Sequence, residues 1–215
     1  MNKSETIKKT ADFVKNKFSN DSSGHDWWHI YRVWQLAKHI SKQERADDFV
    51  VEMSALLHDV TDYKFVKNEE ESLIVPNWLR SLNIEEVKIK EIMEAISSVS
   101  FKGANIDTRP KTLEGKIVQD ADRLDAIGAI GIARGFAFGG AKNRAIHNPG
   151  EKPKRYKSFE DYKKRNTTTI NHFYEKLLLL KDSMNTKAGK KLVIGRHRFM
   201  EQFLDKFFKE WKGIE

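Results

Sequence analysis

Residues 55–64 read ALLHDVTDYK, an apolar helical run that leads directly into the neighbouring residues His58 and Asp59. A second aspartate, Asp62, and a lysine, Lys64, follow shortly afterwards. Polar groups set against this apolar run must leave water at least in part, which is costly unless each group finds a partner or a metal ion. The histidine and aspartate are therefore either a buried structural pair or part of a site.

The hydrophobic spacing around this stretch predicts helices along almost the whole chain. Apolar residues recur every three or four positions, and no alternating run bounded by turns argues for a strand. Pro76 is expected to kink or divide one helix. The fold class is therefore all-α, a single-domain helical bundle. We expect helices over about residues 4–18, 27–44, 47–59, 68–83, 84–99, 113–124, 159–181 and 186–213.

Composition narrows the class of protein. A chain of 215 residues is long enough for one domain, 1–215, with a substantial core. It has no cysteine, so a transition metal must be held by nitrogen and oxygen ligands. We find no secretory signal and no apolar run of about 18 residues, so we expect a cytoplasmic protein that does not enter a membrane. The formal charge of +8 favours polyanionic partners, which could equally be nucleic acid, a membrane surface or small phosphorylated substrates.

Histidines and aspartates gather on three of the predicted helices. Two histidine nitrogens and two carboxylate oxygens drawn from such helices suit Mn, Fe, Zn, Ni or Mg and leave positions for water. This is the ligand set of a metal-dependent hydrolase. The residues are His25 and His29 at the start of the second helix, His58 and Asp59 at the end of the third, and Asp120, Asp122 and Asp125 on the helix after residue 113.

Each part also has a structural explanation. Histidines at helical spacing are often hydrogen-bonded packing features. His58 and Asp59 would also fit a helix end or a bridge to Arg32, and the later aspartates would fit ion pairs with Lys116 or Arg123. The order of the groups, each on its own helix, favours a site over three unrelated structural features.

The segments HIYRV, ALLHDV and DADRLDAIGAIG resemble the three diagnostic segments of the HD-domain phosphohydrolase superfamily, whose metal signature is H...HD...D. The likeness runs from about residue 20 to 140 and extends to small stand-alone bacterial HD hydrolases. It implies an HD-type bundle, with a metal-site core over about 20–140 and a basic loop and C-terminal helices over 141–215. It also implies metal ligation by His29, His58, Asp59 and Asp122. Asp122 is preferred because the last ligand of the family lies in an ADRL context, whereas helical periodicity alone leaves Asp120 equally open.

The chain departs from binuclear members of the family, because no histidine lies between His58 and Asp120. Such members resemble one another in carrying extra histidines there. We therefore expect one divalent metal ion, with manganese preferred over magnesium, iron, nickel, zinc or cobalt. A cyclic dinucleotide phosphodiesterase is correspondingly disfavoured.

Residues near the expected metal suggest roles in phosphoryl chemistry. A divalent ion lowers the pKa of bound water and polarises a phosphoryl oxygen. Asp62 is the candidate to orient or deprotonate that water, unless it is an ordinary turn aspartate. His25 is the candidate to protonate the leaving oxygen. Lys64 and Arg32 are candidates for substrate phosphates, with a solvated lysine and a structural arginine as the alternatives.

The second half is expected to carry specificity. Residues 141–165 hold nine Lys or Arg against three Asp or Glu, and they read as a long loop leading into a helix. If this loop folds over the cleft, Lys142 and Arg144 would favour a phosphate chain; otherwise it is a solvated basic surface. His172 and Lys176, one turn apart on the next predicted helix, are candidates to line the same cleft.

The sequence thus predicts a divalent-metal-dependent phosphohydrolase whose substrate is a nucleotide, preferably a nucleoside or deoxynucleoside triphosphate that loses pyrophosphate or phosphate. One alternative is removal of the 3'-pyrophosphate of guanosine tetraphosphate, because the stringent-response hydrolases share the H...HD...D and ADRL pattern. The other is a basic nucleic-acid-binding protein with a vestigial site, although no helix-turn-helix or interleaved basic-aromatic pattern supports it. A homodimer is left open.

Overall fold

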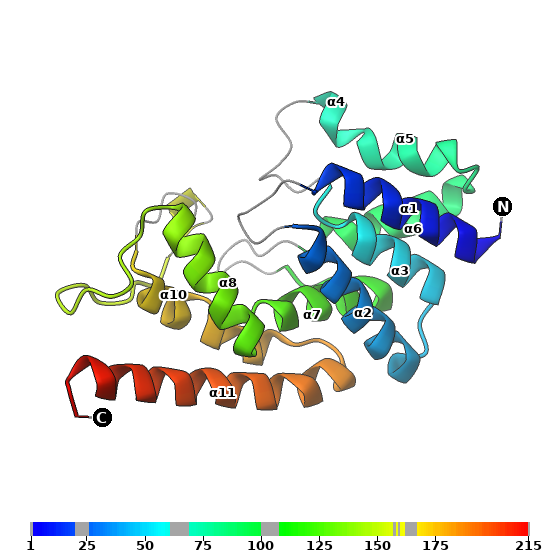
Figure 1. Cartoon of the computed structure of the whole chain (residues 1–215). Helices are drawn as coiled ribbons and strands as arrows, with labels where there is room; N and C mark the ends of the chain where they lie inside the picture. The colour runs from blue at the N-terminus through cyan, green and yellow to red at the C-terminus, as the bar shows by residue number, and fades with distance from the viewer. Residues whose placement is uncertain are drawn as a thin grey trace. The chain divides into compact units, whose positions relative to one another are not determined.

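The structure is a computed structural model, and it describes residues 2–19, 26–60, 69–99, 108–156, 158, 160–161 and 167–214. These residues form helices and no strand (Figure 1). The all-α fold class predicted from hydrophobic spacing is confirmed. Among the described residues no single helix is long and apolar enough to cross a membrane, and only α7 (Leu113–Asp125) and α8 (Gly128–Ala141) taken together reach that length and composition.

The chain divides into two compact units. The first comprises Met1–Phe101 and Asp107–Asp122, and the second comprises Lys102–Ile106 and Arg123–Glu215. The single domain expected over 1–215 stays a prediction.

The first unit is built around α3 (Asp48–Leu57), which contacts three other helices. Eight of its ten residues are buried, because apolar side chains occur on every side of this helix. A helix so enclosed ends inside the unit, so the residues that follow it are buried as well. The other helices of this unit are α1 (Lys3–Lys17), α2 (Trp27–Glu44), α4 (Glu69–Ser72), α5 (Ile74–Ser81), α6 (Glu86–Ser97) and most of α7; α1, α2 and α6 contact α3.

Aspartate side chains fix the starts of α2 and α3. Asp26 accepts a hydrogen bond from the His29 backbone N–H at 2.9 Å, and Asp47 accepts from the first turn of α3. Lys88 also donates to Asp47, over 2.8 Å. Burial raises the pKa of Asp47, but the Lys88 bond and the backbone donors outweigh it and leave this pKa below its ordinary value. The ionised carboxylate therefore stabilises the helix that leads to His58.

Pro76 does not interrupt a helix. The segment predicted as one helix over 68–83 divides at Leu73, and Pro76 occupies the first turn of α5. A backbone N–H in a first turn has no partner within its own helix, so a proline costs little there.

The second unit holds α8, α10 (Thr169–Glu175), a 3-10 helix η1 (Leu177–Ser183) and α11 (Lys187–Trp211). The single long helix predicted over 159–181 is wrong, because α10 ends at Glu175 and Lys176 leaves helical geometry with φ −141° and ψ −61°. Neither glycine nor proline marks this break. Gly139 lets α8 and α10 approach closely, because a Cβ there would lie 2.2 Å from the Thr169 hydroxyl oxygen.

The basic segment after α8 is held to α10 where it is described. Glu175, which is buried, accepts from the Lys154 backbone N–H at 2.9 Å, the Tyr156 hydroxyl at 3.2 Å and the Thr167 hydroxyl at 2.9 Å. The described residues between α8 and residue 160 contain no helix, in line with the predicted loop. One buried carboxylate thus anchors both flanks of the stretch that precedes α10.

Candidate metal centre

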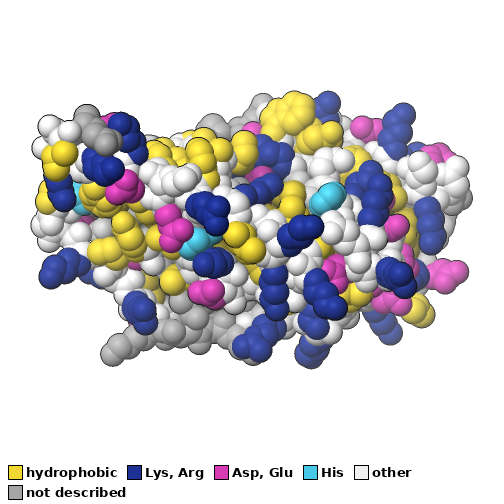
Figure 2. Space-filling view, turned by 90° about the horizontal axis from the view of Figure 1, so that it is seen from below, with side chains coloured by type: hydrophobic (Ala, Val, Ile, Leu, Met, Phe, Trp, Pro, Cys, Tyr) yellow, Lys and Arg dark blue, Asp and Glu magenta, His cyan; other side chains and the backbone are white. Residues whose placement is uncertain are grey.

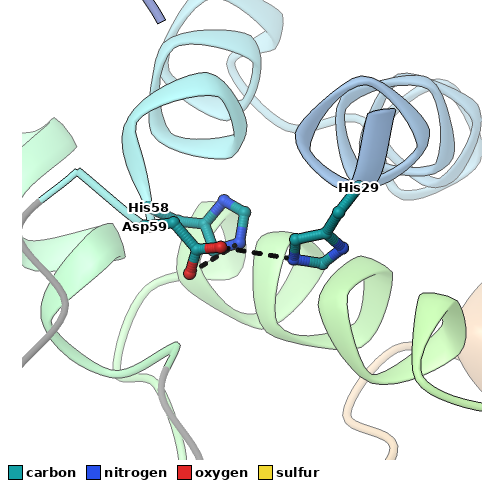
Figure 3. Close-up of side chains that lie close together, drawn as sticks. All are labelled: His29, His58 and Asp59. Carbon is teal, nitrogen blue, oxygen red and sulfur yellow. Dashed lines mark ion pairs between the residues drawn. The ribbon is translucent and has the colours of Figure 1, made fainter. Parts of the chain in front are cut away.

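Three side chains predicted as metal ligands meet inside the first unit. His29 comes from the first turn of α2, and His58 and Asp59 come from the end of α3. Figure 3 shows the three side chains pointing toward one another. One ligand atom from each lies within 4.8 Å of the others. All three are almost fully buried, with His29 at 0%, His58 at 4% and Asp59 at 3% exposure. We call these three residues the metal cluster.

Each oxygen of the Asp59 carboxylate lies close to one imidazole nitrogen of the metal cluster. The Nε2 of His29 lies 3.4 Å from Oδ2 of Asp59, and the Nε2 of His58 lies 3.4 Å from Oδ1 of the same carboxylate. Both distances exceed those of ordinary hydrogen bonds. Ligands about 2.1 Å from a common cation are separated by about 3.0 to 3.4 Å at octahedral or tetrahedral angles. The residues present therefore fit a divalent ion.

The tautomer of His58 supports the same conclusion. Its Nδ1 lies 2.8 Å from the carbonyl oxygen of Ala55. A carbonyl oxygen only accepts, so Nδ1 carries the hydrogen and the neutral ring has its lone pair on Nε2. That Nε2 is buried without a hydrogen-bond partner among the described residues, although the Asp59 carboxylate is nearby. A hydrogen bond donated by the ring nitrogen that does not face the metal is the usual way to orient a metal-binding histidine.

The geometry distinguishes the two candidate aspartates of α7. The Oδ1 of Asp122 lies 3.5 Å from the Nε2 of His29, and its side chain keeps 27% of its surface exposed. Asp120 is fully buried. Asp122 therefore has the position that the ADRL resemblance gives to the last ligand. Its ligation of a metal stays a prediction.

The other predicted site residues of the first unit are only partly described. His25, Asp62 and Lys64 lie outside the described residues. Arg32 is half-buried on α2, one turn after His29. Its proposed contact with phosphate stays a prediction.

The four remaining candidates belong to the second unit. Lys142 and Arg144 gather over the ring of Phe138, with the Lys142 Nζ at 6.0 Å and the Arg144 guanidinium carbon at 5.3 Å from the ring centre. His172 lies in α10, and Lys176 follows its last residue, so the two are one turn apart as expected. Their roles toward a substrate stay predictions.

Two positions that orient the metal cluster were not recognised in the sequence. Ala55 acts through its backbone carbonyl, so its side chain gives no signal beyond its place three residues before a helix-terminal histidine. Asp26 fixes the first turn of α2 and hence the start of the helix that carries His29. An aspartate three residues before His29, at the start of a predicted helix, is the pattern by which Asp26 could have been recognised as an N-cap.

Comparison with known proteins agrees with this geometry. The HD domain family matches residues 27–127. The Bacillus subtilis protein YpgQ, described as uncharacterized, is 38% identical over 205 residues, which cover 94% of this chain and 92% of YpgQ.

Solved structures show the same architecture. A Lactobacillus plantarum protein is 34% identical, with a TM-score of 0.89 over 99% of this chain and 100% of the other. A Bacillus thuringiensis HD-superfamily hydrolase is 46% identical, with a TM-score of 0.78 over 98% and 99% of the two chains. The structure of YpgQ has been solved in complex with ADP. It matches this chain with a TM-score of 0.73 over 95% of this chain and 100% of the solved YpgQ chain.

Proposed function

The chain belongs to the HD domain family of metal-dependent hydrolases, and on that premise we propose that it hydrolyses a nucleotide at a phosphate. The proposed substrate is a nucleoside or deoxynucleoside triphosphate, and the proposed product is pyrophosphate or phosphate. The observation that carries the proposal is the buried metal cluster, with nitrogen and oxygen atoms 3.4 Å apart. A divalent ion bound there activates water and neutralises charge on a phosphoryl group.

The chain's own residues prepare the site for this chemistry. Ala55 keeps the Nε2 lone pair of His58 directed at the cluster, and Asp59 contributes negative charge close to both imidazoles. Because these three side chains are buried and held by their neighbours, we expect little reorganisation of the site during the reaction.

Asp122 is the exposed neighbour of the metal cluster. The side chains of His29 and Asp59 are 0% and 5% exposed, whereas that of Asp122 is 27% exposed. We therefore place the entry of water and of the substrate phosphate on the Asp122 side. Asp62 is proposed to orient the attacking water, and His25 to protonate the leaving group.

Two observations support a nucleotide as the substrate class. YpgQ, which this chain resembles in sequence and fold, was crystallised with ADP. The formal charge of +8 also favours an anionic substrate. Figure 2 shows Lys and Arg side chains scattered across one face, so total charge does not itself mark the binding site. Arg32, Lys64, Lys142, Arg144, His172 and Lys176 are proposed to contact the substrate.

The test is a hydrolysis assay on metal-stripped protein with Mn²⁺ added back. The substrates are the nucleoside and deoxynucleoside triphosphates and guanosine tetraphosphate, and pyrophosphate is resolved from phosphate. His58→Ala should lose both bound metal and turnover. His39→Ala is the matched control, because His39 is an exposed histidine on α2 outside the cluster.

The outcomes separate the candidate functions. Metal-dependent release of pyrophosphate or phosphate from a triphosphate supports the proposal. If guanosine tetraphosphate alone is hydrolysed, the substrate is guanosine tetraphosphate and not a nucleoside triphosphate. Salt-sensitive binding of nucleic acid that persists in His58→Ala, together with no turnover, would favour a binding protein.

A further inference from the structure

Aromatic side chains crowd the first two turns of α2, around the helix position that supplies His29. Tyr31 is their centre, with ring centroids 6.0 Å from Trp27, 5.9 Å from Trp28 and 6.1 Å from Trp34. The interplanar angles to Trp28 and Trp34 are 82° and 83°, an edge-to-face arrangement that aromatic pairs favour. We call Trp27, Trp28, Tyr31 and Trp34 the α2 aromatic cluster.

Part of the α2 aromatic cluster faces water. Trp28 is 60% exposed and Tyr31 is 38% exposed. A single exposed apolar side chain is ordinary on a protein surface. Trp28 differs because it directly precedes the fully buried His29 and is braced by a second exposed ring. The same helical turn thus supplies a metal-cluster histidine to the interior and an indole to solvent.

The helix geometry places Arg32 between these two groups. Successive residues of an α-helix are rotated by about 100° around the axis. Arg32, three positions after His29, therefore lies about 60° from it, and Trp28 lies about 100° from it in the same direction. Arg32 and Trp28 are also four residues apart, so their Cβ atoms are neighbours at about 5 to 6 Å. The order around α2 is histidine, arginine, tryptophan.

This surface is held in place at both ends. Asp26 caps α2 through the His29 backbone N–H, which fixes the turn that carries Trp28. At the other end, the indole N–H of Trp34 donates to Glu52 of α3 over 2.8 Å, and Lys38 lies 5.1 Å from the Trp34 ring centre. A ring in such a braced cluster loses little conformational freedom when a ligand stacks on it, which favours binding.

We propose that Trp28, braced by Tyr31, is the stacking platform for the base of the nucleotide substrate, with Arg32 contacting the phosphates between the base and the metal cluster. This inference rests on the proposed function and adds the subsite that recognises the nucleoside. Every base has a π face, so stacking on an indole tolerates base identity. The enzyme should therefore accept purine and pyrimidine nucleotides alike and discriminate against phosphate chains that lack a base.

The test compares a ligand with a base and one without. Binding of ADP and of inorganic tripolyphosphate to the Mn²⁺-loaded protein is measured by calorimetry, beside kcat/KM for ATP. Trp28→Ala should weaken ADP binding by roughly 5- to 150-fold and leave tripolyphosphate binding unchanged. Trp28→Phe should retain most of the ADP affinity. Trp211→Ala is the matched control, since Trp211 is 50% exposed and lies on α11.

Each outcome distinguishes between possible roles of Trp28. Unchanged ADP affinity in Trp28→Ala, with the wild-type protein still hydrolysing nucleotides, overturns the platform and leaves the proposed function standing. Equal losses of affinity for ADP and for tripolyphosphate would mean that Trp28 acts through His29, and this result would also overturn the stacking platform. A change of oligomeric state on light scattering without a change in ADP affinity would assign Trp28 to an interface between copies. A wild-type protein that neither binds ADP nor hydrolyses any nucleotide would overturn both proposals.

Discussion

Replacing Asp122 by asparagine should weaken metal binding, whereas the same change at Asp120 should not. The Oδ1 of Asp122 lies 3.5 Å from the Nε2 of His29, in the position of a further ligand to an ion held by the metal cluster. Asp120 is only two residues away on α7 and is fully buried. Both substitutions preserve side-chain shape and replace a carboxyl group by an amide.

The magnitude follows from the charge that Asp122→Asn removes. Two unit charges about 4 Å apart interact by about 4 kcal/mol at an effective dielectric constant of about 20, and the double charge of Mn²⁺ makes this figure a lower limit. The side chain of Asp122 is 27% exposed, so solvent screens part of this interaction. With that discount we expect a loss of at least about 3 kcal/mol, or about 150-fold in the dissociation constant for Mn²⁺. Asp120→Asn should instead lower the free energy of unfolding by about 1 to 3 kcal/mol, because it changes a buried polar group.

Calorimetric titration of Mn²⁺ into each metal-stripped variant measures the first quantity, and urea unfolding measures the second. His39→Ala controls for nonspecific loss of metal at an exposed residue of α2. The reasoning is refuted if Asp120→Asn loses the metal while Asp122→Asn binds it as tightly as the wild type.

Three further predictions concern stability. Adding Mn²⁺ at 100 times its dissociation constant should stabilise the wild-type protein by about 2.7 kcal/mol and raise its Tm by about 5 to 11 °C, and an unchanged Tm on calorimetry would count against a metal site. Glu175→Ala leaves three hydrogen-bond donors without their acceptor and should cost at least about 3 kcal/mol in urea unfolding. Glu175→Gln should cost about 1 kcal/mol, because its carbonyl oxygen still accepts and its amide can donate to the Tyr156 hydroxyl. Equal costs for the two variants would contradict this prediction. Asp47→Ala should cost about 1 kcal/mol at pH 7. Because folding lowers the pKa of Asp47, its contribution is fully present above the unfolded value and is lost as pH falls through the folded value. Urea unfolding should therefore show the stabilities of the two proteins converging as pH falls below the ordinary aspartate range, and a constant gap would refute the assignment.

Much of the first unit was predictable because its helices follow simple hydrophobic spacing. The run from Asp48 to Leu57 carries apolar side chains on every side, so a buried helix that ends just before His58 follows from the sequence. The meeting of His29 with His58 and Asp59 was implied by the family resemblance and agrees with the structure. Spacing alone did not bring residues about 30 positions apart together.

Periodicity failed where tertiary contacts decide. Asp120 and Asp122 lie on the same helix with similar neighbours in the sequence, and only the folded structure shows that Asp120 is buried and that Asp122 lies 3.5 Å from His29. Glu175 looks like any glutamate near the end of an amphipathic helix, yet it is buried by the segment that it anchors. The break at Lys176 also carries no local signal, since the four leucines that follow it suit a helix as well as the 3-10 turn they form.

The most direct test of the central claim measures metal content and nucleotide turnover in the same sample. Metal-stripped protein is titrated with Mn²⁺ while release of pyrophosphate and phosphate from ATP is followed. A single site formed by His29, His58, Asp59 and Asp122 predicts turnover that rises in proportion to bound metal and reaches its maximum at one ion per chain. Full turnover without bound metal, or a maximum only at two ions per chain, would contradict the account.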